Sequence, residues 1–260
     1  MLVLFLDPER RMMHKKALHY LSGILLDLAV TTCVLITMLT IHLFIITPHT
    51  GARHESNTVA SLNEQWKKPD PLTPPDPIPA PEYGDTFATA SIPRLGDDWE
   101  YSIKATTSLE NLRTGIAWYS LTSLPGETGN FSLAAHRDGS TAPFANIDTL
   151  QTCDAITINT QGGSYTYTVL PLSTDPSEID AFTHCAPEAA EHHPEITDGT
   201  IPGQRIVEPT AVQVVNPTPG EAPDVPATAA WLTLTSCHPH FSNAQRIIIH
   251  AILTQAHGRN

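Results

Sequence analysis

One long uncharged run near the N-terminus constrains this chain more than any other feature. Residues 28–47 read LAVTTCVLITMLTIHLFIIT and contain no Asp, Glu, Lys or Arg. A helix of this length measures about 30 Å, which is the thickness of the hydrocarbon core of a bilayer. The first twenty residues carry more basic than acidic side chains, which favours a cytoplasmic location for them. We therefore predict a cytoplasmic N-terminus at residues 1–20 and a transmembrane signal anchor at residues 21–47.

Two other interpretations of this run are a buried core helix and a cleaved signal peptide. Core helices are usually shorter, and a signal peptide has an apolar region of about 7–15 residues followed by an A-x-A-like site. Here the run is longer and continues into TPHTGARH. An uncleaved anchor is therefore favoured, which makes this a single-pass protein of the cell membrane with its remaining residues outside the cell.

The net charge of the chain limits its possible partners, and its proline content limits the conformation of the segment after the anchor. The chain has 14 Lys and Arg against 27 Asp and Glu, a net charge of −13, which disfavours nucleic acid as a partner. Seven of the thirteen residues between Pro69 and Pro81 are proline, and such a segment favours an extended polyproline II conformation. We predict that residues 48–82 form a Pro-rich extracellular stalk. An SH3-type ligand is the alternative, but an exported segment would rarely meet such a domain.

The remainder of the chain is predicted to be all-β. Between residues 83 and 257, short runs rich in Val, Ile, Thr and Tyr recur between Gly, Pro and Asp, and several show the alternation of a half-buried strand. Their number favours a closed or nearly closed barrel or a sandwich. Residues 117–121 and 142–150 are predicted to be short helical turns. The expected strands lie at residues 86–92, 130–136, 154–160, 164–172, 205–215, 228–236 and 245–253.

Residues 175–204 do not follow this strand pattern. They are acidic, contain several prolines and are predicted to form a long exposed loop, with at most one helical turn, inserted in the domain. A metal site built from His184, His192, His193 and nearby carboxylates is the alternative, but their spacing matches no defined ligand set. We therefore expect neither a metal nor a cofactor.

Three residues at strand ends carry the candidate chemistry. The strand at 228–236 delivers Cys237 to its end, Arg246 begins the next strand, and His136 ends an earlier one. Cationic neighbours favour a thiolate, His can carry a proton, and Arg can stabilise an oxyanion. Taken singly, Cys237 could equally be a small buried hydrophobic residue, His136 a structural histidine and Arg246 a surface charge.

The sequence around these residues resembles that of the sortases, which are membrane-anchored cysteine transpeptidases of Gram-positive bacteria. The matching motifs are T-L-x-[ST]-C at 233–237 with Arg246 nine residues later, and A-H-R at 135–137. More narrowly, YGDTFATASIPRLG, PGETGNFSLAAHRDG and SCHPHFSNAQR look like class E sortases of high-GC Gram-positive bacteria. The resemblance covers residues 83–257 and implies a catalytic domain built on the eight-stranded sortase β-barrel. It places Cys237 as the nucleophile, His136 as the general acid/base and Arg246 as the substrate-orienting or oxyanion-stabilising residue.

The resemblance also implies the reaction and the partners. A sortase cleaves an LPxTG- or LAxTG-type sorting signal of another secreted protein between Thr and Gly, through a thioester. It then passes the protein to an amino group of a cell-wall precursor. The alternatives are a pilus-polymerising sortase, whose acceptor is a pilin Lys, and a non-catalytic surface-binding module on a stalk.

The sequence departs from the family at a few positions. Ser236 stands for the Thr before the nucleophile and keeps its hydroxyl, and Tyr119 ends an Ala-Trp-Tyr segment where class E sortases often have Gly-His-Tyr. Both are expected to contact the substrate, with the substrate or acceptor preference left open. Cys153 replaces a common Gly, and in an exported domain it either pairs with Cys185, tying the insertion to the barrel, or remains free.

Overall fold

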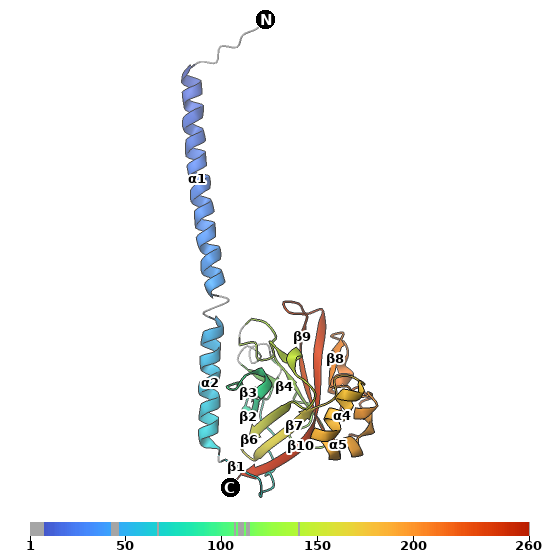
Figure 1. Ribbon diagram of the computed structural model, residues 1–260. Helices are drawn as coiled ribbons and strands as arrows, with labels where there is room; N and C mark the ends of the chain where they lie inside the picture. Colours follow the sequence, from blue (N-terminus) through green and yellow to red (C-terminus); the bar gives the residue numbers. More distant parts are fainter. Residues whose placement is uncertain are drawn as a thin grey trace. The chain divides into compact units, whose positions relative to one another are not determined.

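The computed structural model describes residues 8–42, 47–66, 68–106, 108, 112, 115–139 and 141–259 (Figure 1). The chain divides into two compact units, Met1–Thr47 and Pro48–Asn260. The first unit contains one long helix, α1 (Pro8–Ile41). Its part Leu18–Ile41 is long and apolar enough to cross a membrane, and none of it is buried inside the protein. The predicted apolar helix is thus confirmed as a candidate membrane span, although residues 43–46 of the predicted 21–47 segment lie outside the described residues.

The second unit is a closed β-barrel, as predicted. Its strands neighbour one another in the order β10-β7-β6-β2-β3-β4-β5-β9, and β9 pairs again with β10, which closes a ring of eight strands. Two short strands, β1 (Pro69–Asp70) and β8 (Gln204–Val207), pair with β10 outside this ring. The ring consists of β2 (Thr86–Ser91), β3 (Glu100–Lys104), β4 (Ile116–Trp118), β5 (Gly129–Ala134), β6 (Ala155–Thr160), β7 (Gly163–Val169), β9 (Ala230–His238) and β10 (Gln245–Arg259).

Some local predictions were wrong. Residues 117–121 were expected to be a helical turn, but Ala117 and Trp118 belong to β4, which pairs with both β3 and β5. A strand of three buried residues is too short to show an alternating pattern. Of residues 205–215, only the beginning is a strand, and Val212–Val215 form the 3-10 helix η4. The turn predicted at 142–150 is confirmed, with the 3-10 helix η3 at Ile147–Thr149.

The barrel is filled by alternate residues of its strands. On β9, Leu232 and Leu234 lie in the main core, together with Ile247 and Ile249 of β10. Since successive side chains of a strand point to opposite faces, the residues between them lie on the outside of the barrel. Trp231, for example, belongs to a second apolar cluster.

This second cluster overturns the prediction of an exposed loop at residues 175–204. The segment forms three helices, α4 (Pro176–Cys185), α5 (Pro187–His192) and α6 (Pro194–Thr197), each with proline in its first turn, a position that suits proline. Phe182 and Ile196 are buried with Trp231. The segment has few apolar residues of its own, and it folds because the outer face of the barrel supplies the rest of the cluster. Figure 1 shows α4 and α5 beside β10.

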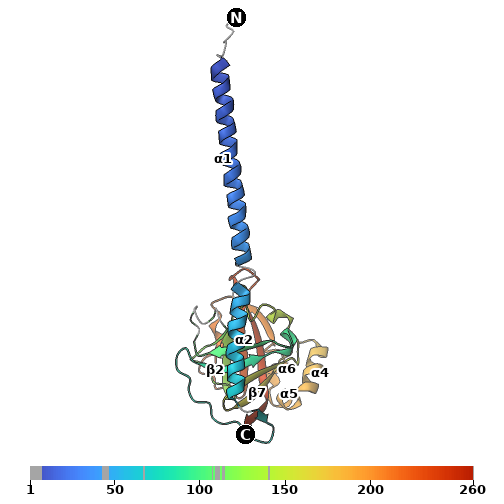
Figure 2. The ribbon, with the colours of Figure 1, turned by 90° about the vertical axis from the view of Figure 1, so that its left-hand side faces the viewer.

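The predicted stalk at residues 48–82 is also corrected, because most of it lies on the barrel. Its first part is α2 (Thr47–Gln65), where Glu55 is buried and accepts a hydrogen bond from the backbone N–H of Ser102. Figure 2 shows α2 passing in front of the barrel strands. The Pro-rich part contains no helix and no strand longer than β1.

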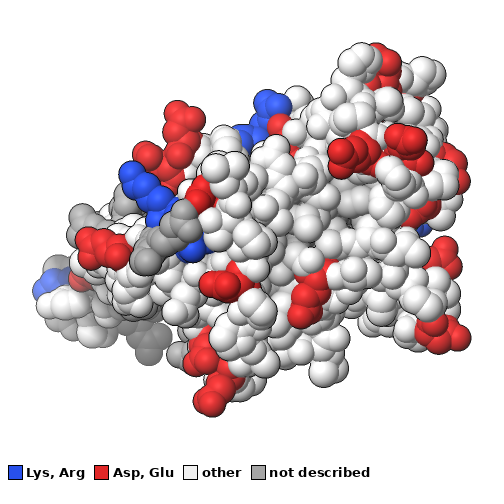
Figure 3. Space-filling view, turned by 90° about the horizontal axis from the view of Figure 1, so that it is seen from below, with Lys and Arg blue, Asp and Glu red and all other residues white. Residues whose placement is uncertain are grey.

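Glycines explain why the Pro-rich part can lie so close to the barrel. The backbone N–H of Asp76 donates to the carbonyl of Gly162 (3.0 Å), and that of Gly258 donates to Thr73 (2.6 Å). A Cβ atom at Gly162 or Gly258 would collide with the backbone of Asp76 or Pro74. The Pro-rich segment therefore packs against the turn between β6 and β7 at Gly162 and against β10 at Gly258, where neither residue carries a side chain. The side chains exposed on the face in Figure 3 are more often acidic than basic.

We predict that the domain needs the residues before Tyr83 for full stability. A protein starting at Pro48 should fold, and one starting at Tyr83 should lose at least about 2 kcal/mol of unfolding free energy, because a buried N–H loses its carboxylate acceptor and β1 is removed. Urea denaturation of the two proteins measures the difference. Equal stabilities would show that the packing of residues 48–82 is energetically neutral.

Candidate active site

The pairing of β9 with β10 places Cys237 and Arg246 together. The two residues are directly opposite each other in this antiparallel pair, so their side chains lie on the same side of the sheet, about 5 Å apart at Cβ. Alternation along β9 puts Leu232 and Leu234 in the barrel core and Thr235 and Cys237 on the outer face. The thiol and the guanidinium are therefore both carried on the outside of the barrel, at the end of β9.

His136 reaches the same place from β5. This strand runs parallel to β9, with Ala134 beside Thr235 at the last paired position. Beyond it, the Ser236 hydroxyl donates to the Ala135 carbonyl (2.8 Å), and the side chains of Arg137 and His238 are in contact (2.7 Å). These contacts lie on either side of His136 and of Cys237, so they bring the two backbone positions next to each other.

The three residues are accessible. Cys237 is a free thiol of intermediate exposure, and His136 and Arg246 are also partly exposed. The Nη1 atom of Arg246 donates to the carbonyls of Asn243 (3.0 Å) and Gln245 (2.8 Å). The end of the loop between β9 and β10 and the first residue of β10 thus orient the guanidinium, and Cys237, Arg246 and His136 are each partly exposed.

A buried polar layer supports this outer face. Thr233 donates to the Asn130 side chain (2.8 Å) and contacts Nδ1 of His250 (3.0 Å). Asn130 in turn donates to the carbonyls of Val214 and Asn216, which attaches η4 to the barrel. Complete burial lowers the pKa of His250 to about 3, with a smaller contribution from the Arg205 charge. His250 is therefore neutral in the folded protein at ordinary pH.

The remaining predicted site residues have other partners. Ser236 is buried, and its hydroxyl donates to the backbone carbonyl of Ala135. The hydroxyl of Tyr119 contacts that of Thr235 (3.1 Å). Arg137 and His238 lie at the site and stand in the quoted motifs, but no role was predicted for them from the sequence. Their positions immediately after His136 and Cys237 are the signal that could have found them.

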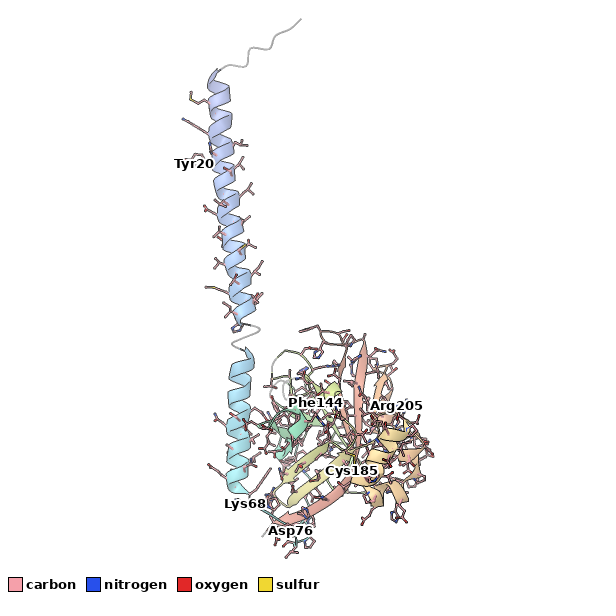
Figure 4. The ribbon with its side chains drawn as sticks, viewed as in Figure 1. Tyr20, Lys68, Asp76, Phe144, Cys185 and Arg205 are labelled. Atoms are coloured by element: carbon pink, nitrogen blue, oxygen red, sulfur yellow. A yellow bond between two sulfur atoms is a disulfide. The ribbon has the colours of Figure 1, made fainter. Side chains whose placement is uncertain are left out.

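Cys153 and Cys185 are joined by a disulfide with a sulfur–sulfur distance of 2.05 Å. It attaches the end of α4, where Cys185 lies (Figure 4), to the loop before β6. Cys153 has a positive φ of 73°, a conformation that glycine adopts most readily. This agrees with the glycine that the resemblance placed there.

The histidines of the insertion bond within it. Nδ1 of His184 and of His192 each contact a carbonyl four residues earlier, and His193 contacts Glu195. Among the residues that the structure describes, no group of three His, Cys, Asp or Glu is placed to hold a metal ion. A cavity of about 600 Å³ lies between α5 and the outer faces of β7 and β10, and its lining does not include Cys237.

Comparison with known proteins gives consistent matches. A family model for the sortase domain matches residues 91–254. The sortase SrtE2 of Streptomyces coelicolor is 46% identical over 74 residues, and the match spans 25% of this chain and only 29% of that protein. The SrtF sortase of Corynebacterium diphtheriae is 35% identical with a TM-score of 0.66, covering 74% of this chain and 95% of that one. Sortase E of Streptomyces avermitilis is 26% identical with a TM-score of 0.50, covering 68% and 92%.

The buried His250 predicts how stability depends on pH. Unfolded histidine binds a proton below about pH 6.5, whereas folded His250 stays neutral down to about pH 3. Stability from this residue is therefore complete above pH 6.5 and is lost as the pH falls. Between pH 7 and pH 5 the wild type should lose about 2 kcal/mol more than a His250→Asn variant, as measured by urea unfolding at both pH values. Equal losses would show that His250 is not held neutral.

Proposed function

The chain belongs to the sortase family and is a sortase-type transpeptidase, and we propose that it joins exported proteins to an amino group of the cell wall. Its substrate would be a secreted protein with a C-terminal sorting signal of the LPxTG or LAxTG type. Cleavage would fall between Thr and Gly, and the acceptor would be the amine of a cell-wall precursor. The helix at residues 18–41 would anchor the enzyme in the cell membrane, with the N-terminus in the cytoplasm and the barrel outside.

In the first half-reaction Cys237 would be the nucleophile. Its thiolate attacks the carbonyl carbon of the sorting-signal Thr, and the bond between Thr and Gly breaks as a thioester forms on the sulfur. Splitting the exchange into two steps in this way is covalent catalysis. Arg246 lies opposite Cys237 on the neighbouring strand, where its positive charge can stabilise the oxyanion of the tetrahedral intermediate.

His136 would move the proton in both halves of the reaction. An amine leaves poorly unless it is protonated, and His136 at the end of β5 can donate that proton to the departing Gly. In the second half it accepts a proton from the incoming amine, which then attacks the thioester and releases Cys237. Proton transfer of this kind typically contributes about 10²–10⁴-fold to the rate.

The observation that carries this proposal is the convergence of three strand ends on one face. Residues 101 positions apart along the chain are held together by the hydrogen bond from Ser236 to Ala135. A non-catalytic binding module has no need for a partly exposed thiol between a histidine and an arginine.

We predict that the acyl group is carried by Cys237. A sorting-signal peptide added to the wild type should give a thioester adduct that mass spectrometry locates on Cys237. Cys237→Ala should abolish cleavage and transfer, and His136→Ala should lower the rate by about 10²–10⁴-fold, because the leaving amine is no longer protonated.

The matched control is Cys33→Ala, because Cys33 is the other free cysteine in the described part of the chain and lies in α1. This variant should keep full activity. Cleavage by the Cys237→Ala protein, or an adduct located on any other cysteine, would contradict the assigned nucleophile.

A further inference from the structure

The two short segments that carry His136 and Cys237 are joined by one contact before these residues and one contact after them. The Ser236 hydroxyl donates to the Ala135 carbonyl (2.8 Å), and Arg137 contacts His238 two residues further along both segments (2.7 Å). Between these two contacts, His136 and Cys237 are neighbours.

Asp138, the residue after Arg137, makes further contacts between the same two segments. The carboxylate of Asp138 contacts His240 (2.7 Å) and accepts the backbone N–H of Phe241 (2.7 Å). Burial alone would raise the pKa of Asp138, but the hydrogen bonds from His240 and Phe241, together with the charges of His240 and Arg137, lower it. The carboxylate is therefore ionised and holds the loop between β9 and β10 against the end of β5.

Arg137 is the buried member of this set, with 3% of its surface exposed. Its Nη2 atom pairs with the carboxylate of Asp148 (2.7 Å), and its Nε atom donates to the Ala145 carbonyl (3.4 Å). One planar guanidinium thus joins the end of β5, the end of β9 and the turn at residues 142–150. A Lys side chain has no such fixed fork of donors.

The contact between Arg137 and His238 also determines which nitrogen of the His238 ring accepts a hydrogen bond. A guanidinium can only donate hydrogen bonds, so Nδ1 of His238 must accept. The hydrogen of the neutral ring then lies on Nε2. His238 follows Cys237 directly in β9, so a contact that orients His238 also orients the backbone that carries the thiol.

We propose that Arg137 is a positioning residue, which sets the spacing of His136 and Cys237 by holding His238 at the end of β9. The inference rests on the proposed function for its kinetic consequences but not for its geometry. In this role Arg137 touches neither the substrate nor the reacting atoms. Its effect is exerted through the two strand ends, and a misplacement of reacting groups by about 1 Å can cost roughly 10²-fold in rate.

The kinetic test compares two substitutions of His238 in the full chain in detergent. His238→Asn keeps an acceptor oxygen at the position of Nδ1, and His238→Leu removes it. The Leu variant should lower kcat by about 10–100-fold with little change in KM, and the Asn variant should recover most of it. Arg137→Gln should resemble the Leu variant, and combining the two should add no further loss. Arg94→Gln removes a pair of similar length, with Asp154 (2.9 Å), and should leave kcat unchanged.

A second measurement needs no catalysis. The His136→Cys variant brings a second thiol beside Cys237, and adjacent strand positions lie within the Cα spacing of about 4.4–6.8 Å that a disulfide requires. Mild oxidation and peptide mapping should show a rapid cross-link, which becomes slower when His238→Leu is added and returns with His238→Asn. An inactive wild type would refute the proposed function and leave this measurement intact. No cross-link in the His136→Cys protein, or the same rate and kcat with Leu and Asn at position 238, would overturn the inference.

Discussion

The parallel pairing of β5 with β9 is the constraint on which the proposed active site depends. Parallel neighbours end at the same edge of a sheet, so His136 and Cys237 arrive side by side although they come from distant parts of the chain. The antiparallel return of β10 adds Arg246 opposite Cys237. The ring closes through the same β9–β10 pair, so the strand pair that closes the barrel also places Arg246 opposite Cys237. A change that shifted β9 by one residue would turn Cys237 toward the core.

The outer face of β9 and β10 carries two separate features. Near the end of β9 it carries the candidate catalytic residues, and near the start of β9 it packs beneath the insertion through Trp231 and Ile252. Buried polar contacts of Thr233, Asn130 and His250 separate the two regions. The Cys153–Cys185 disulfide attaches the insertion at a further point. The barrel core can therefore stay apolar while its exterior holds both a folded insertion and an exposed thiol.

Sequence patterns predicted the features that depend on local chemistry. The apolar helix, most barrel strands and the neighbourhood of Cys237, His136 and Arg246 followed from hydropathy, alternation and motif. Features that depend on distant partners were missed. β4 is too short to alternate, and α4–α6 fold only against Trp231, which is remote in sequence. The Pro-rich segment was predicted to be a stalk that does not contact the barrel. Its own composition does not reveal that glycines elsewhere in the chain, such as Gly162, leave room for it to pack there. Arg137 was passed over because its partners, Asp148 and His238, are brought to it by the fold.

We propose that Cys237, His136 and Arg246 act together on a carbonyl group. A crystal structure of the protein with a sorting-signal peptide bound covalently to Cys237 would test it most directly. We expect the oxygen of the attached carbonyl to lie about 3 Å from the Arg246 guanidinium and the His136 ring to lie within hydrogen-bonding reach of the sulfur or the leaving-group position. A peptide bound to Cys237 with Arg246 still directed only at the carbonyls of its own loop, and His136 turned away, would contradict the claim.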